Sequence, residues 1–229
     1  AEEAIFLRSK TEKMTKFTLP GPMTISDTIA NEFYADKEEM AMEFAKLLND
    51  EAKTLCDAGI DVIQFDEPAF NSFLNESIEW GMDAMEVAID GLECKTAIHI
   101  CYGYGIEENL NWKKTLGDQW RQYENLFPAI NQSNIDQVSL EFAGSRVPPK
   151  LMRLLPDKEI MAGVISVVGD YIESAEEVEQ NIISVLDHVE AERLIPCTNC
   201  GMAPISVDVA KQKLKALGEG SERAAKRIS

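Results

Sequence analysis

The sequence has no run of about 18 apolar residues that could cross a membrane, and its first residues show no signal-peptide pattern. Low-complexity linkers and short internal repeats are missing as well. These absences predict a cytoplasmic protein without a membrane anchor. A single domain over residues 1–229 is the simplest organisation, because α/β barrels commonly exceed about 200 residues as one unit.

Basic residues are also scarce. Lys and Arg number 22 against 40 Asp and Glu, so the formal net charge is -18. This deficit argues against nucleic acid or an anionic membrane as a partner, since both attract basic surfaces. Acidity of this kind serves solubility more often than function.

Cysteine is sparse and odd in number, which is not typical of the paired frameworks of secreted proteins. Reduced thiols that are available to a metal ion fit this count better. The five cysteines are Cys56, Cys94, Cys101, Cys197 and Cys200.

What the chain does contain is an alternation of short apolar runs with longer amphipathic ones. We predict six strands, at residues 16–19, 61–65, 96–100, 137–141, 159–166 and 194–197. We predict helices at residues 1–12, 36–58, 76–91, 117–130, 149–155, 174–188 and 207–216, with a capping box opening the helix at 174. Repeated strand–helix units predict a parallel sheet, either doubly wound or a (β/α)8 barrel of the TIM type.

Polar residues cluster at or just after the C-terminal ends of four of these strands. In barrel enzymes ligands bind at that face, because the strand ends aim side chains at a common centre. The barrel therefore explains the clustering better than an open sheet does. The residues concerned are Asp66, Glu67, His99, Cys101, Glu141 and Cys200.

The strand at 96–100 ends in a pattern that suits a metal ion. Side chains at i and i+2 of a strand point to the same side, so His99 and Cys101 could converge on one ion. The alternative is a core histidine beside a core cysteine, since buried cysteine often behaves as a small hydrophobe.

Further metal ligands are available later in the chain. Glu141 ends an otherwise apolar or small strand, where a buried carboxylate needs a positive partner. Cys197 and Cys200 form a Cys-x-x-Cys pair, which could also be a redox pair or half of a structural zinc site. His99, Cys101, Glu141 and one of these cysteines are ligand types that zinc accepts. Such a site carries a formal negative charge, which keeps a further thiolate nucleophilic rather than acidifying water.

At these residues the sequence resembles the catalytic C-terminal domain of cobalamin-independent methionine synthase, particularly its short, single-domain bacterial and archaeal relatives. The resemblance runs from about residue 16 to the end. The matching segments are residues 21–25, 62–69, 99–103, 138–141, 163–165 and 200–202.

The resemblance implies a zinc ion held by His99, Cys101, Glu141 and Cys200, in preference to Cys197. It implies a methyltransferase that moves a methyl group to the thiol of homocysteine and forms methionine. Asp66 would contact the amino group of homocysteine, with Glu67 a weaker candidate. Alternatively, Asp66 or Glu67 caps a neighbouring helix or ties down the loop at Pro68.

The chain departs from the family pattern in three places. The family has two further βα units before residue 1, so either the chain is a fragment or its barrel is incomplete. A tryptophan that stacks on folate is replaced near Thr28, and a histidine proposed as proton donor to the leaving folate is replaced by Val168.

These departures lead us to expect a methylcorrinoid, or a corrinoid protein, as methyl donor in preference to methyltetrahydrofolate. The aromatic segment at residues 106–127 would offer it a surface, although such residues are more often core. Two other functions stay open: methyl transfer to another thiol such as coenzyme M, and a degenerate zinc-binding barrel without turnover.

Overall fold

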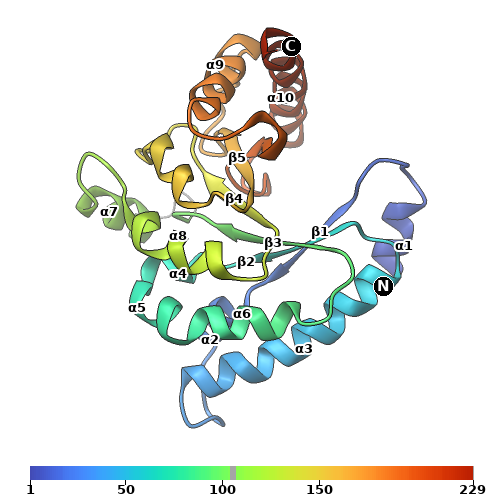
Figure 1. Ribbon diagram of the computed structural model, residues 1–229, viewed down its shortest axis with the longest axis vertical. Helices are drawn as coiled ribbons and strands as arrows, with labels where there is room; N and C mark the ends of the chain where they lie inside the picture. The colour runs from blue at the N-terminus through green and yellow to red at the C-terminus, as the bar shows by residue number, and fades with distance from the viewer. Residues whose placement is uncertain (104–106, 229) are drawn as a thin grey trace. The chain divides into compact units, whose positions relative to one another are not determined.

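The computed structural model describes residues 1–103 and 107–228, without the side chains of residues 108 and 109 (Figure 1). Ile106, the start of the predicted aromatic segment, lies outside the described residues. Within them, no helix combines the length and apolarity needed to cross a bilayer.

All six predicted strands are present. They are β1 (Lys16–Pro20), β2 (Val62–Asp66), β3 (Lys95–Ile100), β4 (Gln137–Glu141), β5 (Glu159–Ile165) and β6 (Leu194–Thr198). They follow one another in the sheet in chain order, and β1 with β2, β2 with β3, and β5 with β6 are parallel pairs. A doubly wound sheet would reverse its strand order partway, so this order is that of a (β/α)8 barrel, of which six strands are described.

The helices between the strands are more numerous than we predicted. Those in the described residues are α1 (Glu2–Arg8), α2 (Pro22–Thr28), α3 (Lys37–Asp57), α4 (Ala69–Ser72), α5 (Leu74–Glu76), η1 (Ser77–Gly81), α6 (Met82–Ile89), α7 (Glu107–Thr115), α8 (Gln122–Gln132), η2 (Pro149–Leu154), α9 (Ala175–Leu186), η3 (Ala191–Arg193) and α10 (Val207–Ile228). The capping box at Ser174 is confirmed, with the Glu177 backbone N–H donating to the Ser174 hydroxyl and the Glu177 carboxylate accepting from the Ser174 N–H. The helices α2 and α7 were not predicted.

Two residues show why helix bounds were missed. Pro22 lies beyond the predicted strand at residues 16–19 and outside every predicted helix, but it occupies the first turn of α2, where its fixed φ suits a helix start. The last helix was expected to end at residue 216, before Gly218 and Gly220, but α10 continues to Ile228. A Cβ at Gly220 would lie 2.5 Å from the Cβ of Val178, so glycine permits close packing of α10 on α9. Tertiary packing thus overrides the low helix propensity of glycine.

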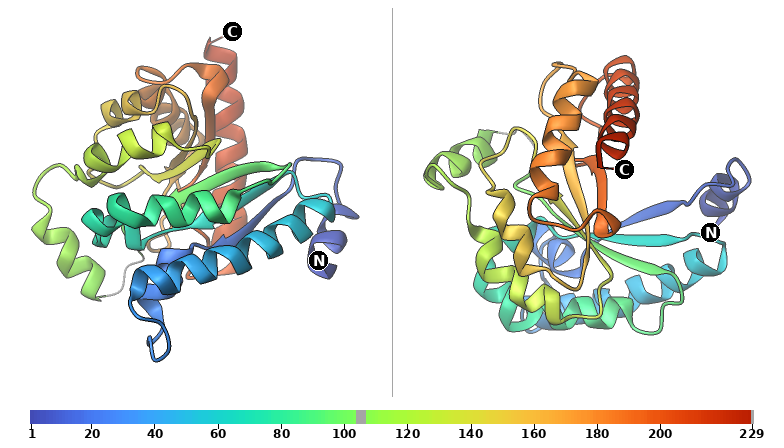
Figure 2. Two further views of the ribbon diagram at one scale, coloured as in Figure 1. Left: turned by 60° about the horizontal axis from the view of Figure 1, so that its bottom comes forward. Right: turned by 45° about the horizontal axis from the view of Figure 1, so that its top comes forward.

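The chain forms two compact units. The first comprises residues 1–100 and 125–138, and it contains β1 to β3 with α3 packed on α2 and α6 (Figure 2). The second comprises residues 101–124 and 139–229, and in it α9 and α10 pack on each other beside β5 and β6. The single domain over residues 1–229 stays a prediction.

One expectation about cysteine is wrong. Cys56, at the end of α3, and Cys94, directly before β3, form a disulfide with their Cα atoms 5.7 Å apart. They are 38 residues apart in sequence and meet only because α3 and the segment before β3 pack together. Cys101, Cys197 and Cys200 are thiols.

Candidate metal centre

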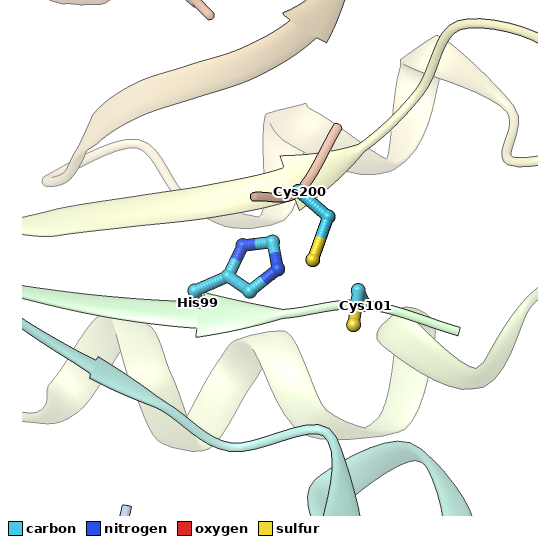
Figure 3. Close-up of side chains that lie close together, drawn as sticks. All are labelled: His99, Cys101 and Cys200. Carbon is cyan, nitrogen blue, oxygen red and sulfur yellow. The ribbon is translucent and has the colours of Figure 1, made fainter. Parts of the chain in front are cut away.

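The end of β3 and the loop after β6 bring three metal-ligand side chains together. His99 and Cys101 are both buried, and Cys200 is half-buried. The ligand atoms of these three residues all lie within 4.8 Å of one another (Figure 3). One imidazole and two thiols are donors that zinc prefers, so the residues present fit a zinc ion.

Cys200 rather than Cys197 belongs to this group. Cys197 lies inside β6, where it is paired with Gly163 of β5. Cys200 follows the end of β6, and its carbonyl accepts a hydrogen bond of 2.9 Å from the hydroxyl of Thr198. Spacing alone left the two cysteines equivalent, and the end of the strand separates them.

Glu141 lies close to this group but outside the 4.8 Å cluster. It is the last residue of β4, and its Oε2 accepts a hydrogen bond of 3.0 Å from the backbone N–H of Tyr102. Its Oε1 is 3.6 Å from the ammonium of Lys113, which is itself buried and donates to the carbonyl of Gly103. The sequence predicted a positive partner for Glu141, and Lys113 is one that we did not identify, because α7 was not predicted.

The electrostatics of the thiols also favour a cation. The hydrogen bond shared with Cys200 and burial raise the pKa of the Cys101 thiol well above its ordinary value, and the Glu141 carboxylate raises it further. A nearby cation has the opposite effect, because it stabilises the thiolate. A divalent ion bound here would therefore lower the pKa of the Cys101 thiol and let it bind as a thiolate.

Asp66 lies beside His99 in the sheet. The two residues are partners in the register of β2 and β3. The carboxylate of Asp66 accepts a hydrogen bond of 2.7 Å from the side-chain amide of Gln64, whose oxygen accepts from the ammonium of Lys16 at 2.6 Å. This chain of hydrogen bonds holds the half-buried carboxylate next to a metal-ligand candidate.

Glu67, the next residue, has a different environment. It is fully buried, and its carboxylate accepts hydrogen bonds from the backbone N–H groups of Met23 and Thr24 and from the Thr24 hydroxyl, at 2.9, 2.9 and 2.6 Å. It thus caps the N-terminus of α2, as one of our two interpretations anticipated. A Cβ at Gly21 would lie 2.1 Å from the Glu67 carboxyl carbon, so only glycine leaves room for this cap.

Glu67 should make stability depend on pH. Burial raises the pKa of its carboxyl from 4.5 to about 7. Between these values the folded protein keeps the proton that the unfolded chain has lost, so rising pH favours unfolding. The free energy of unfolding should fall by up to about 3 kcal/mol across this window. Chemical denaturation of the parent and of Glu67→Gln at pH 4.5 and 7 measures this change in the free energy of unfolding. An equal pH dependence in both proteins would contradict the role of Glu67.

The aromatic residues of the predicted docking segment are mostly core. Trp120, Tyr123 and Phe127 are buried. The ring of Tyr102 lies 4.8 Å from that of Trp120 and 5.2 Å from that of Tyr123. Packing, the alternative left open above, therefore accounts for these three side chains.

The parallel strands in chain order and the His–Cys–Cys group at the carboxyl ends of strands define an α/β protein of the barrel type with a candidate zinc centre. The chain belongs to the cobalamin-independent synthase family, whose catalytic-domain model matches residues 1–223. The resemblance seen in the sequence is thereby confirmed.

Methionine synthases of two archaea are among the similar proteins. That of Saccharolobus islandicus (strain L.S.2.15 / Lassen #1) is 34% identical over 209 residues, which are 90% of this chain and 57% of the relative. That of Sulfurisphaera tokodaii is 32% identical over 223 residues, 96% of this chain and 60% of the relative. The chain therefore spans little more than half the length of these relatives.

Solved structures extend the comparison. A B12-independent methionine synthase from Shewanella sp. W3-18-1, in complex with selenomethionine, is 52% identical with a TM-score of 0.96, over 99% of this chain and 67% of that one. A methyltransferase from Methanosarcina mazei has a TM-score of 0.65 at 14% identity, over 95% of this chain and 63% of that one, and shares the fold alone.

These relatives bear on the methyl donor. A family described as cobalamin-independent weighs against the methylcorrinoid that we expected from Thr28 and Val168. The hydroxyl of Thr28 donates to the carbonyls of Thr24 and Ile25 in its own helix, and Val168 is exposed. The absence of an aromatic or acidic group at two positions is weak evidence, because other residues can supply a stacking surface or a proton.

Proposed function

We propose that this chain carries a zinc-dependent transfer of a methyl group to the thiol of homocysteine, forming methionine. The observation that carries the proposal is the convergence of His99, Cys101 and Cys200 in a member of this family. The relative from Shewanella, crystallised with selenomethionine, binds a selenium analogue of the proposed product.

In this proposal His99, Cys101 and Cys200 hold the zinc ion, and Glu141 supplies the fourth ligand. Zinc, when bound, acts as a Lewis acid that favours the ionised form of the substrate thiol. The hydrogen bond from the Tyr102 N–H keeps the carboxylate of Glu141 at the end of β4. The four residues lie at or just past strand ends, where a barrel binds its ligands.

Asp66 would bind the ammonium group of homocysteine. Its carboxylate is already oriented by Gln64, so little side-chain entropy is lost on binding. In this proposal Glu67 does not contact the substrate. It acts indirectly, because its cap fixes α2 next to the end of β2. During transfer the thiol releases its proton to water, a sulfur–carbon bond forms, and the bond between the methyl group and its donor breaks. The donor atom takes up a proton from water in place of the methyl group, so one proton is released and one is consumed.

We propose a methylated folate as the donor. The family description supports it, whereas the methylcorrinoid hypothesis depends on two substituted positions. Coenzyme M methylation remains the alternative thiol chemistry, and a barrel without turnover the non-catalytic one.

Methionine formation tests this proposal. With homocysteine, the zinc-loaded protein should form methionine from methyltetrahydrofolate at least about ten times faster than from methylcobalamin, which corresponds to a barrier difference of roughly 1.4 kcal/mol. Methionine is measured by mass spectrometry, with protein stripped by a chelator as the control. Faster turnover with methylcobalamin would restore the corrinoid hypothesis, and methylation of coenzyme M but not homocysteine would change the acceptor. No turnover with any pair, in protein that includes any residues preceding residue 1, would leave a non-catalytic zinc barrel.

A further inference from the structure

Asn199, directly before Cys200, uses both its side chain and its backbone in hydrogen bonds to other parts of the chain. Asn199 is buried in the loop that follows β6. Its side-chain oxygen accepts from the backbone N–H groups of Phe142 and Ala143 at 3.0 and 3.1 Å, and its side-chain nitrogen donates to the carbonyl of Ala143 at 2.7 Å. Its backbone N–H donates to the carbonyl of Ile165 at 2.9 Å. One asparagine thus ties the loop after β6 to the ends of β4 and β5.

Gly163 of β5, which has no Cβ, leaves room for the side chain of Asn199. A Cβ at Gly163 would lie 2.4 Å from the Asn199 side-chain oxygen, 2.6 Å from its Cα and 2.7 Å from the carbonyl oxygen of Leu140. Real Cβ atoms essentially never come so close to backbone atoms, so any other residue here would displace Asn199 or the strands. The glycine at 163 and the asparagine at 199 are therefore complementary.

The residues that Asn199 connects stand next to metal-ligand candidates. Cys200 follows Asn199 directly, and Phe142 follows Glu141 at the end of β4. Because the amide of Asn199 bonds the backbone immediately after Glu141, it fixes the distance between the backbone segments that carry these two ligands. All of these residues lie in the second unit of the chain.

We propose that Asn199 is a positioning residue of the metal centre, which holds Cys200 in register with the end of β4 so that both can reach one ion. This inference rests on the zinc centre of the proposed function. Hydrogen bonds that orient ligands commonly change metal affinity 10–100-fold when they are lost. Gly163 and Cys200 belong to the segments that resemble the family, whereas no sequence pattern predicts a role for Asn199.

The test compares Asn199→Ala with Asn49→Ala. Asn49 is also buried, and its side-chain nitrogen donates to the carbonyls of Ala88 and Asp90 at 3.0 and 2.8 Å, far from any proposed ligand in sequence. Both variants should lose stability. Zinc affinity, measured by competition with a chromogenic chelator, should fall about 10–100-fold in Asn199→Ala and stay within about threefold in Asn49→Ala. The thiolate-to-cobalt absorption of the cobalt-substituted protein should change only in Asn199→Ala.

Each outcome has a distinct meaning. Unchanged zinc affinity and an unchanged cobalt spectrum in Asn199→Ala would overturn the inference while leaving the proposed function intact. A parent protein that binds neither metal would overturn the proposed function itself, and the inference with it. If Asn199→Ala does not fold, Asn199→Asp keeps the two accepted hydrogen bonds and loses the donated one. Weaker zinc binding by that variant, despite its added negative charge, supports the inference, and unweakened binding contradicts it.

Discussion

Replacing Cys200 by serine is expected to abolish stoichiometric zinc binding. The parent protein should hold about one zinc ion per chain, since three donors lie within 4.8 Å and a carboxylate stands nearby. Serine is nearly isosteric, but its hydroxyl does not ionise readily, so a strong thiolate ligand is lost. Because losing the hydrogen bonds that orient metal ligands already costs about 10–100-fold in affinity, losing a ligand itself should cost more than about 100-fold. Methyl transfer should fall with the zinc content.

Elemental analysis of freshly purified protein measures this result directly. Cys101→Ser should behave like Cys200→Ser, because both sulfur atoms belong to the same group. Cys197→Ser is the matched control, since Cys197 is equally a thiol and lies three residues from Cys200 but outside the group. Parent protein without zinc, or equal loss of zinc in Cys197→Ser, would refute the assignment.

Replacing Asp66 by asparagine should weaken homocysteine binding by about 100-fold. An ammonium that has left water for a protein site needs an anionic partner, and truncating one member of such a pair costs roughly 2–5 kcal/mol. The lower part of that range applies because Asp66 is only half-buried. Zinc content should stay near that of the parent, since Asp66 is outside the group of three ligands.

Calorimetric titration of zinc-loaded protein with homocysteine measures the affinity. Asp83→Asn is the matched control, because it removes the same charge from an exposed position on α6. A different outcome would favour a structural role for Asp66. If Asp66→Asn unfolds the protein or strips the metal, while the remaining zinc-loaded molecules bind homocysteine normally, then Asp66 ties down the loop at Pro68.

Local sequence patterns were sufficient for the strands. All six predicted strands are present because short apolar runs bounded by turn residues leave the chain few alternatives. The His-x-Cys pattern was equally local, since residues two apart at a strand end share a side whatever the rest of the chain does. The helix α9 was predicted nearly to its first residue, because its capping box is a contact between residues three apart.

The helix bounds and the ion-pair partner that we did not predict involve residues that are distant in sequence. The start of α2 depends on the carboxylate of Glu67, more than 40 residues away, which compensates for a cap that Gly21 cannot make. The part of α10 beyond residue 216, which we did not predict, packs closely against Val178 at Gly220. Lys113 could not be assigned to Glu141 without knowing that the segment around it is helical.

The sequence by itself determined the parallel α/β architecture, the family and the pairing of His99 with Cys101, because each follows from spacing along one strand or from a run of matching residues. Spacing left Cys197 and Cys200 equivalent, and both the family resemblance and the tertiary structure favour Cys200. Only the tertiary structure joined Cys56 to Cys94 and showed that Glu67 caps a helix. The hydrogen bonds by which Asn199 joins the loop after β6 to the end of β4 are likewise seen only in the tertiary structure. Spacing specifies which way a side chain points from its own backbone, whereas a contact across tens of residues exists only once strands and helices have packed.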